Sequence, residues 1–231
     1  AMAPRGGGKM TIGFRIRRNT RKIAPDLVAK FRALPVANVS DMMARMTAGG
    51  PRLRPFHAGG GMAGPALTVK TRPGDNLMVH KALDLAEPGD VVVVDAGGDL
   101  TNAIIGELML AHAIQRRLGG IVINGAVRDV AAIRAHRFPV FAAGATHRGP
   151  YKDGPGEINA PIAIDGMVVA PGDLIIGDDD GLASLDPKSI VKFIAEAEGK
   201  LAKEAEWQAS LTAGRTVAET FQLGSPQAGE R

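Results

Sequence analysis

Residues 89–130 read GDVVVVDAGGDLTNAIIGELMLAHAIQRRLGGIVINGAVRDV, and this stretch decides the fold class. It holds two β-branched runs, residues 91–94 and 121–123, of the kind found in strands that are buried on both faces. The apolar segment between them ends at Leu118-Gly119-Gly120, and glycine is a common residue just beyond a helix. A buried strand, a helix and a second buried strand indicate an α/β core.

The sequence on either side extends this pattern. Helices are expected at residues 23–34, 39–46, 77–86 and 127–136, and strands at residues 66–70 and 140–142. Short strands follow at residues 161–164, 167–169, 174–176 and 182–185, and Asp165-Gly166 is a strong hairpin signal. A final helix is expected to be capped by Asp186, with Pro187 at its first position.

The late strands have no helices between them, so we expect an α/β fold with a mixed sheet rather than a doubly wound one. Three regions are predicted: a basic arm over residues 1–22, an α/β domain over residues 23–186, and a helical extension over residues 187–231. The arm and the extension exceed what the core needs. Because interfaces between identical chains reuse such extensions, we expect the last helix to pack on a neighbouring subunit.

The composition excludes several classes of site. The chain has no cysteine, which removes disulfides, thiolate nucleophiles, zinc–thiolate sites and iron–sulfur clusters. A bound metal must therefore be held by oxygen or imidazole, which favours a hard ion such as Mg²⁺ or Mn²⁺. Aromatic residues make up only 4%, which argues against a stacking platform for single-stranded nucleic acid.

The net charge of +4 is unevenly distributed. Residues 1–30 carry +7, and the remaining residues carry −3. A basic arm of this kind can touch nucleic acid or anionic lipid, but its lack of interleaved aromatics favours a solvated or subunit-packing arm. No apolar run approaches the ~20 residues of a membrane helix, and no secretory signal is recognisable. The expected location is the cytoplasm.

Residues 106–109, Gly106-Glu107-Leu108-Met109, form the first candidate site. If Ile104-Ile105 is still extended, a helix opens here, and its free amides can bind a carboxylate or phosphate. The alternative is a single helix over residues 101–118 with Glu107 as a solvated side chain. Periodicity alone leaves the two interpretations even.

Arg128-Asp129 forms the second candidate site, directly after a buried strand. In α/β folds, residues just beyond the carboxyl ends of strands line the ligand crevice. Asp129 can hold a divalent cation, and Arg128 can grip a substrate carboxylate or enolate oxygen. The alternative from the residues alone is that Asp129 caps the next helix and Arg128 makes a surface ion pair.

Other polar groups give weaker signals. Residues 178–181 have the composition of a calcium loop but lack the distal glutamate, so an acidic turn is expected. The five histidines show no metal-binding spacing. Lys70 and Lys152 are possible Schiff-base lysines, which need a desolvated pocket that a sequence cannot reveal.

Three runs together resemble a known family. They are GGDLTNAIIGELMLAHAIQRRLGGIVINGAVRDV at residues 97–130, KDGPGEINAPIAI at residues 152–164 and PGDLIIGDDDG at residues 171–181. They are similar to the 4-hydroxy-4-methyl-2-oxoglutarate aldolases, a family that also contains the regulator of ribonuclease activity A. The resemblance covers roughly residues 39–190. It implies a swivelling β/β/α fold, assembly as a homotrimer or a hexamer of two trimers, and active sites at subunit interfaces.

The resemblance also implies an activity and roles for the candidate residues. The aldolases need Mg²⁺ or Mn²⁺, cleave 4-hydroxy-4-methyl-2-oxoglutarate or 4-carboxy-4-hydroxy-2-oxoadipate to release pyruvate, and often decarboxylate oxaloacetate. By position, the substrate-binding stretch falls on Gly106, Glu107, Leu108 and Met109, the substrate arginine on Arg128, and the metal-binding aspartate on Asp129. Many aldolases have aspartate where this chain has Glu107, which we expect to act catalytically by holding a water as the base.

Two other functions remain open at this stage. The first is a binding protein that inhibits a ribonuclease, although such regulators tend to lack the aspartate that follows the arginine, so Asp129 favours an enzyme. The second is a lyase of the same family that acts on another oxo acid or sugar acid. The sequence predicts no membrane partner and argues against a nucleic-acid partner.

Overall fold

The computed structural model describes residues 13–18 and 22–223. Its core is a sheet of nine strands with the order β1-β6-β5-β3-β2-β10-β11, in which β4 also pairs with β5 and β7 with β2. The strands are β1 (Arg54–Pro55), β2 (Met62–Thr71), β3 (Val91–Asp95), β4 (Ala103–Ile105), β5 (Gly120–Val127), β6 (Val140–Ala145), β7 (Gly156–Ile158), β10 (Leu174–Gly177) and β11 (Leu182–Leu185). A separate hairpin is formed by β8 (Ile162–Ile164) and β9 (Met167–Val169).

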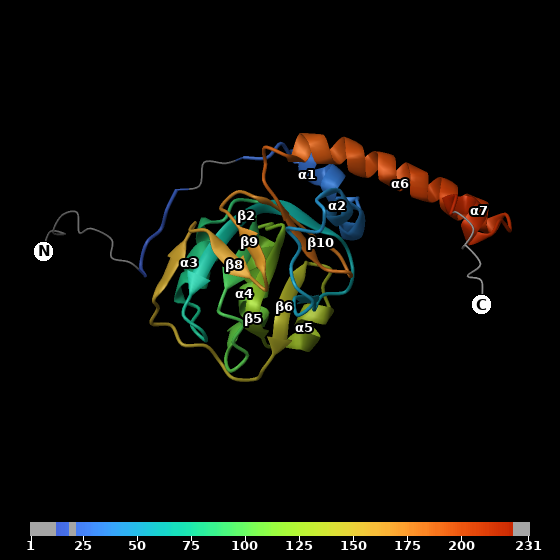
Figure 1. Ribbon diagram of the computed structural model, residues 1–231. Coiled ribbons are helices and arrows are strands. Elements are labelled where there is room, and N and C mark those ends of the chain that lie inside the picture. The colour runs from blue at the N-terminus through green and yellow to red at the C-terminus, as the bar shows by residue number, and fades with distance from the viewer. Residues whose placement is uncertain (1–12, 19–21, 224–231) are drawn as a thin grey trace, which may run out of the picture.

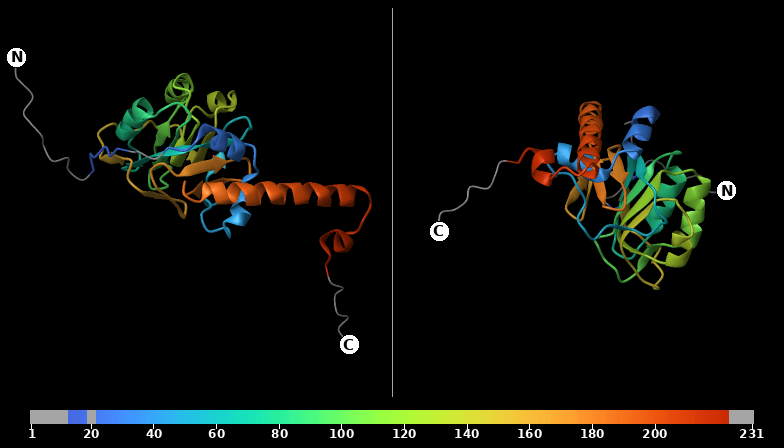
Figure 2. Two further views of the ribbon diagram at one scale, coloured as in Figure 1. Left: turned by 90° about the horizontal axis from the view of Figure 1, so that it is seen from above. Right: turned by 90° about the vertical axis from the view of Figure 1, so that its right-hand side faces the viewer.

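The centre of the sheet is parallel, and its margins are antiparallel. Strands β2, β3, β5 and β6 run in parallel, and β1, β7 and β10 join them in antiparallel pairs. Helices α3 (Leu77–Leu85), α4 (Glu107–Gln115) and α5 (Val130–Arg134) connect the parallel strands and lie on one face of the sheet (Figures 1 and 2). The expected α/β fold with a mixed sheet is confirmed.

The run of four valines in β3 is explained by the two layers that cover the sheet. Val92 and Val94 pack toward helices α3, α4 and α5, whereas Val91 and Val93 pack toward the β8–β9 hairpin. All four are fully buried. A strand covered on both faces needs apolar residues at every position, and this removes the alternation that a half-exposed strand would show.

The remaining helices are α1 (Pro25–Arg32), α2 (Val36–Met42), α6 (Ile190–Thr212) and α7 (Val217–Phe221). The first turns of α6 pack with α1, α2 and β10 through Ile190, Ile194 and Ala197. Lys200 and Glu204 of α6 also bond to Asp41 and Asn38 of α2. Beyond Glu204, α6 projects away from the body, and α7 folds back at its far end (Figure 2). Among residues 13–18 and 22–223, no helix combines the length and the apolar composition that a membrane-spanning helix requires.

Three predicted boundaries were wrong. The helix expected at residues 127–136 begins only at Val130, because β5 continues through Val127 and Asp129 has a left-handed φ of 55°. The helix expected at residues 39–46 spans Val36–Met42, because Ala44 and Arg45 have positive φ values. The last helix begins at Ile190 with no side-chain cap.

The residues expected to open that last helix instead form a turn before it. Asp186 accepts a hydrogen bond from the Lys188 amide at 3.1 Å, and the Ser189 amide donates to the Asp186 carbonyl at 2.8 Å. The predicted Asp165-Gly166 hairpin turn is confirmed, with positive φ values of 43° and 88°. Of the basic arm, residues 13–18 run beside β7, and the part at residues 1–12 and 19–21 lies outside the described residues.

Candidate active site

The two candidate motifs meet because β4 pairs with the end of β5. Ala103 and Ile105 are aligned with Ala126 and Val127, and the Arg128 amide donates to the Ile105 carbonyl at 3.0 Å. Residues 103–105 are therefore extended, and α4 begins at Glu107 with Gly106 as its N-terminal cap residue. This settles the two interpretations left open by periodicity, since a single helix over residues 101–118 is excluded.

Asp129 caps a helix, but not the helix that follows it in sequence. Its Oδ2 atom accepts a hydrogen bond from the backbone amide of Glu107 at 2.9 Å, at the start of α4. It makes no side-chain cap to α5. The guanidinium Nε of Arg128 lies 3.6 Å from the same oxygen. The side chains of Arg128 and Asp129 are 42% and 41% exposed, so both remain accessible to a ligand.

Gly106 is the point of closest approach between the motifs. A Cβ atom at this position would lie 2.3 Å from Asp129 Oδ2 and 2.9 Å from Arg128 Cγ. Both distances are shorter than a Cβ contact tolerates. The carboxylate of Asp129 is on a short side chain and is held by the Glu107 amide, so it has little room to move aside. The lack of a side chain at Gly106 therefore allows Arg128 and Asp129 to sit against the first turn of α4.

Arg128 forms part of the wall between two hollows. The first, of about 270 Å³, is lined by Asn76, His80, Ile104, Ile105, Gly106, Leu108, Met109, Arg128, Gly149, Pro150 and Lys152. The second is more open and is lined by Arg128, Asp129, Val130, Ala145, Thr146 and His147. The first hollow, which we call the α4 pocket, brings two cations together with the first turn of α4, an arrangement suited to an anionic ligand.

Two polar residues of the α4 pocket, His80 and Asn76, were not singled out from the sequence. Burial lowers the pKa of His80, and the nearby charge of Lys152 lowers it further, so the imidazole is neutral at neutral pH. Asn76 is buried and donates from Nδ2 to the Ile104 carbonyl at 2.9 Å, while its Oδ1 has no partner in the described residues. Lys152 was singled out beforehand, but for a different chemistry.

Glu107 and Leu108 are placed differently from each other. The side chain of Glu107 is exposed and lines neither hollow, although its amide holds Asp129. Leu108 is 84% exposed and stands at the margin of the α4 pocket. The expected catalytic role of Glu107 stays a prediction.

The described residues offer a limited set of metal ligands. No group of three or more histidine, aspartate or glutamate side chains gathers in the described part of the chain. Asp129 Oδ1 has no protein partner there, whereas Oδ2 is already held by Glu107 and Arg128. Mg²⁺ often binds through one or two carboxylates together with water and substrate oxygens. One free carboxylate oxygen beside an anion pocket fits that mode of binding.

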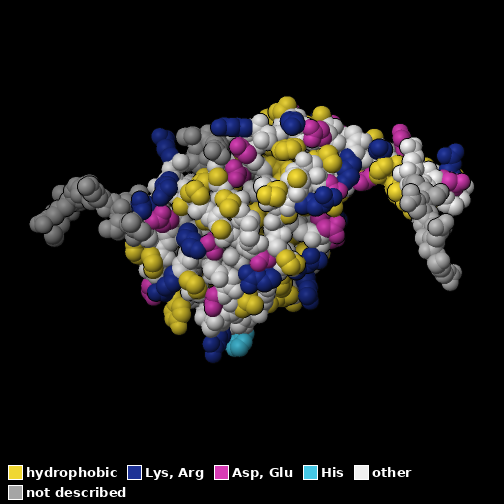
Figure 3. All heavy atoms as spheres, viewed as in Figure 1, with side chains coloured by type: hydrophobic (Ala, Val, Ile, Leu, Met, Phe, Trp, Pro, Cys, Tyr) yellow, Lys and Arg dark blue, Asp and Glu magenta, His cyan; other side chains and the backbone are white. Residues whose placement is uncertain are grey.

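The remaining candidates from the sequence are structural. Lys70 donates to the buried carboxylate of Asp95 at 2.5 Å. Residues 178–181 form the expected acidic turn, in which Asp178 accepts from the amides of Asp180 and Val36. On the face shown in Figure 3, basic and acidic side chains are interspersed over the body of the molecule, and no large area is of one sign.

Comparison with known proteins identifies the family. The family model for RraA-like proteins, described as Aldolase/RraA, matches residues 36–183. The chain belongs to the RraA-like family. The match includes every predicted site residue, from Gly106 to Asp129, and the resemblance inferred from the sequence motifs is thereby confirmed.

Two similar proteins are named as aldolases, one of them provisionally. A Halalkalibacterium halodurans protein, provisionally named a 4-hydroxy-4-methyl-2-oxoglutarate aldolase, is 38% identical over 179 residues, which cover 78% of this chain and 85% of that protein. A Thermus thermophilus protein named 4-hydroxy-4-methyl-2-oxoglutarate aldolase is 36% identical over 140 residues, which cover 59% of this chain and 85% of the relative.

Solved structures show the same fold. An uncharacterised Pseudomonas syringae protein matches with a TM-score of 0.78 at 22% identity, over 88% of this chain and all of that chain. A Thermus thermophilus structure described as the RNA-processing inhibitor RraA matches with a TM-score of 0.61 at 31% identity, over 65% of this chain and 92% of that chain. The names of RraA-like proteins therefore include both an aldolase and an RNA-processing inhibitor. Which of these two functions this chain has depends on the chemistry of its candidate site.

Proposed function

We propose that the protein is a divalent-metal-dependent aldolase that cleaves 4-hydroxy-4-methyl-2-oxoglutarate or 4-carboxy-4-hydroxy-2-oxoadipate, releases pyruvate, and also decarboxylates oxaloacetate. The observation that carries this proposal is the contact between Asp129 and the first turn of α4 beside a cationic pocket. An inhibitor needs a surface for its partner, but it does not need a glycine that admits a carboxylate and a guanidinium to a helix start. The relatives named as aldolases support the same choice.

Substrate binding is assigned to the α4 pocket. The amides of Leu108 and Met109 lie in the first turn of α4, where a helix has no internal acceptors for its N–H groups. These amides and the helix dipole favour the carboxylate of an oxo acid, and Arg128 and Lys152 supply positive charge around it. The neutral His80 ring adds a hydrogen-bonding group without repelling the two cations.

The reaction requires stabilisation of a pyruvate enolate. Mg²⁺ or Mn²⁺ held by Asp129 would act as a Lewis acid toward the keto group of the substrate. Arg128 places a fixed positive charge beside the developing enolate oxygen, which needs no reorganisation during the reaction. Proton removal from the 4-hydroxyl is assigned to a water held by Glu107, whose carboxylate is exposed next to the start of α4.

Assembly from several copies is part of the proposal. Helix α6 has 23 residues, yet its buried residues end at Ala197. The last turns of α6 and the residues that follow it leave Leu211, Phe221 and Leu223 exposed on a projecting arm. Apolar side chains on an isolated helix pair are poorly stabilised in water, so a second copy of this chain is the occupant that we expect, in a homotrimer or hexamer.

The decisive experiment measures pyruvate release from a panel of 4-hydroxy-2-oxo acids and from oxaloacetate, with Mg²⁺ or Mn²⁺ and with EDTA. We expect metal-dependent release that EDTA abolishes. Arg128→Ala and Asp129→Ala are each expected to lower turnover by about 10²–10³-fold, the typical cost of one oxyanion-stabilising group. Arg137→Ala and Asp179→Ala, which remove exposed charges outside both hollows, serve as matched controls.

The outcomes separate the rival functions. Near-wild-type turnover by a folded Arg128→Ala or Asp129→Ala variant contradicts the proposed site. Release from other oxo acids or sugar acids alone assigns a different substrate within the same family. No release from any member of the panel, combined with metal-independent inhibition of a ribonuclease, favours the inhibitor, for which the structure named RraA is the supporting observation.

A further inference from the structure

A loop without regular structure forms one side of the α4 pocket. Residues 149–154, called here the 149–154 loop, contribute Gly149, Pro150 and Lys152 to its lining. A segment of this kind has many accessible conformations, and each bound substrate would have to order it again. The contacts that hold this loop therefore bear on how well the pocket is formed before a substrate arrives.

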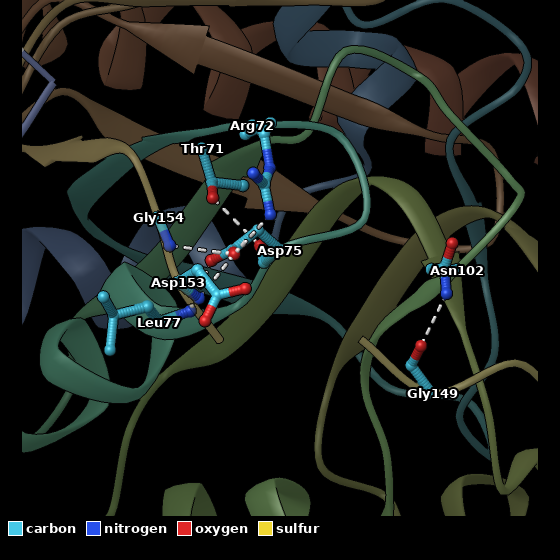
Figure 4. Close-up of polar contacts among 8 residues, drawn as sticks. All are labelled: Thr71, Arg72, Asp75, Leu77, Asn102, Gly149, Asp153 and Gly154. Carbon is cyan, nitrogen blue, oxygen red and sulfur yellow. Dashed lines mark hydrogen bonds and ion pairs between the residues drawn. The ribbon is translucent and has the colours of Figure 1, made fainter. Parts of the chain in front are cut away.

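Asp75 holds the C-terminal end of the loop. Its carboxylate is fully buried, and Oδ2 accepts from the amides of Asp153 at 2.8 Å and Gly154 at 2.9 Å. Arg72 reaches the same oxygen at 3.1 Å, and Oδ1 accepts from the Leu77 amide at 2.9 Å. Figure 4 shows the carboxylate between the start of α3 and the loop. A buried charge is costly unless it is fully hydrogen-bonded, and here four donors surround it.

Backbone hydrogen bonds of the residues on either side of Asp75 also hold the 149–154 loop. The Tyr151 amide donates to the Gly74 carbonyl at 2.8 Å, and the Asn76 amide donates to the Tyr151 carbonyl at 3.0 Å. Lys152 therefore lies between two residues, Tyr151 and Asp153, whose backbones are both bound to residues 74–76. This arrangement fixes the point from which the Lys152 side chain enters the pocket.

Asn102 holds the other end of the loop. Its Nδ2 donates to the Gly149 carbonyl at 2.6 Å, and Figure 4 shows this hydrogen bond as distinct from those of Asp75. The Ala103 amide donates to the Arg148 carbonyl at 2.8 Å, so the loop is joined there to β4. A Cβ atom on Gly149 would lie 3.2 Å from Arg128 Nη1. The position of Gly149 thus limits where the guanidinium of Arg128 can lie.

We propose that Asp75 and Asn102 are positioning residues of the oxo-acid site, which fasten the two ends of the 149–154 loop. Asp75 sets the origin of Lys152, and Asn102 sets the backbone of Gly149 against Arg128. Neither side chain lines the pocket, so both act through other residues. This inference rests on the proposed function, because it concerns how the same pocket receives its substrate.

The test uses steady-state kinetics with oxaloacetate on the full chain with Mg²⁺. Asp75→Asn and Asn102→Ala are each expected to raise KM by about 3- to 10-fold, the cost of ordering one or two side chains on binding, with kcat changed by less than about 3-fold. Asn102 is only partly buried, so its variant is expected to fold even if Asp75→Asn does not. Asp178→Asn is the matched control, since Asp178 also accepts a backbone amide, that of Val36, but neither it nor Val36 lines the pocket.

A double-mutant cycle identifies the route by which Asp75 acts. If Asp75 acts through Lys152, Asp75→Asn changes KM by less than about 2-fold once Lys152→Met is present. Hydrogen exchange at the Asp153 and Gly154 amides is expected to accelerate in Asp75→Asn but not in Asp178→Asn. If Asp75 had a purely structural role, Asp75→Asn would lower Tm and the fraction of active protein. The KM of the remaining active protein would be unchanged, and no coupling with Lys152→Met would be measured.

The outcomes distinguish this inference from the proposed function. An active wild-type protein with unchanged KM in Asn102→Ala, or with KM effects of Asp75→Asn and Lys152→Met that simply multiply, overturns the inference and leaves the aldolase assignment standing. A folded wild-type protein that releases no pyruvate from any oxo acid overturns the proposed function, and this inference with it. A raised KM together with a coupled cycle supports both.

Discussion

The carboxylate of Asp129 accepts a hydrogen bond from the backbone amide of Glu107 at 2.9 Å, although the two residues are 22 positions apart. This contact joins the end of β5 to the start of α4 and places the predicted metal ligand beside the predicted substrate-binding stretch. The side chain that caps a helix start usually belongs to the residue just before the helix. A cap from Asp129, at the end of β5, therefore depends on the tertiary structure. It orients Oδ2 inward and leaves Oδ1 without a protein partner in the described residues.

Gly106→Ala is expected to remove activity while the rest of the fold persists. The new Cβ would approach Asp129 Oδ2 to 2.3 Å, so the carboxylate and the adjacent guanidinium must move away from the helix start. We expect a loss of at least about 10²-fold in pyruvate release, comparable to removing an oxyanion-stabilising group. Circular dichroism should report a native spectrum.

Gly199→Ala is the matched control for that substitution. Gly199 lies within α6, and a Cβ there would meet no atom within 4 Å. Alanine is favoured over glycine inside a helix by about 1 kcal/mol, so Tm is expected to stay or rise, with activity retained. Full activity in Gly106→Ala would show that the pair does not need its close approach to α4.

Glu107→Gln tests the assignment of the base. The substitution keeps the amide that holds Asp129 and removes only the charge of an exposed side chain. If Glu107 holds the water that takes the proton, kcat is expected to fall by about 10²–10⁴-fold with little change in KM. Asp179→Asn, which removes the charge of an exposed carboxylate outside both hollows, is the control. A kcat within about 3-fold of wild type in Glu107→Gln would place the base on another group.

The attachment of residues 13–17 is expected to depend on pH through Glu157. The Gly13 amide donates to this carboxylate at 2.9 Å and, with Arg15 and Arg17, holds its pKa below the ordinary value of 4.5. Because the pKa is lower in the folded protein, the contribution to stability is complete above 4.5 and is lost as the pH falls through the folded value. Burial of the carboxylate opposes this shift without reversing it.

Thermal unfolding of wild type and Glu157→Gln as a function of pH measures this contribution. Wild type should have the higher Tm near neutral pH, and the two curves should converge below the ordinary glutamate pKa. Glu206→Gln, which removes an exposed carboxylate on α6 that makes no hydrogen bond or ion pair among the described residues, controls for general effects of charge. Parallel curves for wild type and Glu157→Gln down to acid pH would contradict the proposed attachment.

The projecting arm formed by α6 and α7 predicts the state of assembly. Size-exclusion chromatography with light scattering should give three or six times the 24.0 kDa mass of one chain. Leu211→Glu, on the exposed distal part of α6, is expected to shift the protein toward the monomer by placing a charge in an apolar contact. Val168→Glu, an exposed apolar position on β9, is the control. A monomeric wild type at micromolar concentration contradicts this prediction.

Much of the fold could be predicted because local patterns carry it. The β-branched runs at residues 91–94 and 121–123 became β3 and β5, and the Asp165-Gly166 turn joined β8 to β9. The positions at which helices begin were harder to predict from the sequence. Asp186-Pro187 has the sequence of a helix start but forms a turn, since the helix can begin only where its apolar face reaches the α1–α2 packing at Ile190.

The sequence by itself determined the parallel strands at the centre of the sheet and the late hairpin strands, the adjacency of Arg128 and Asp129 after a buried strand, and the family. Tertiary structure alone decided that residues 103–105 are extended, because their pairing with β5 supplies hydrogen bonds that a helix would otherwise provide. It also decided that Asp129 caps α4 and that Asp75 holds a loop 78 residues further along the chain. Such contacts join residues far apart in sequence, and no local periodicity encodes a hydrogen bond whose partner is brought in by the packing of the whole sheet.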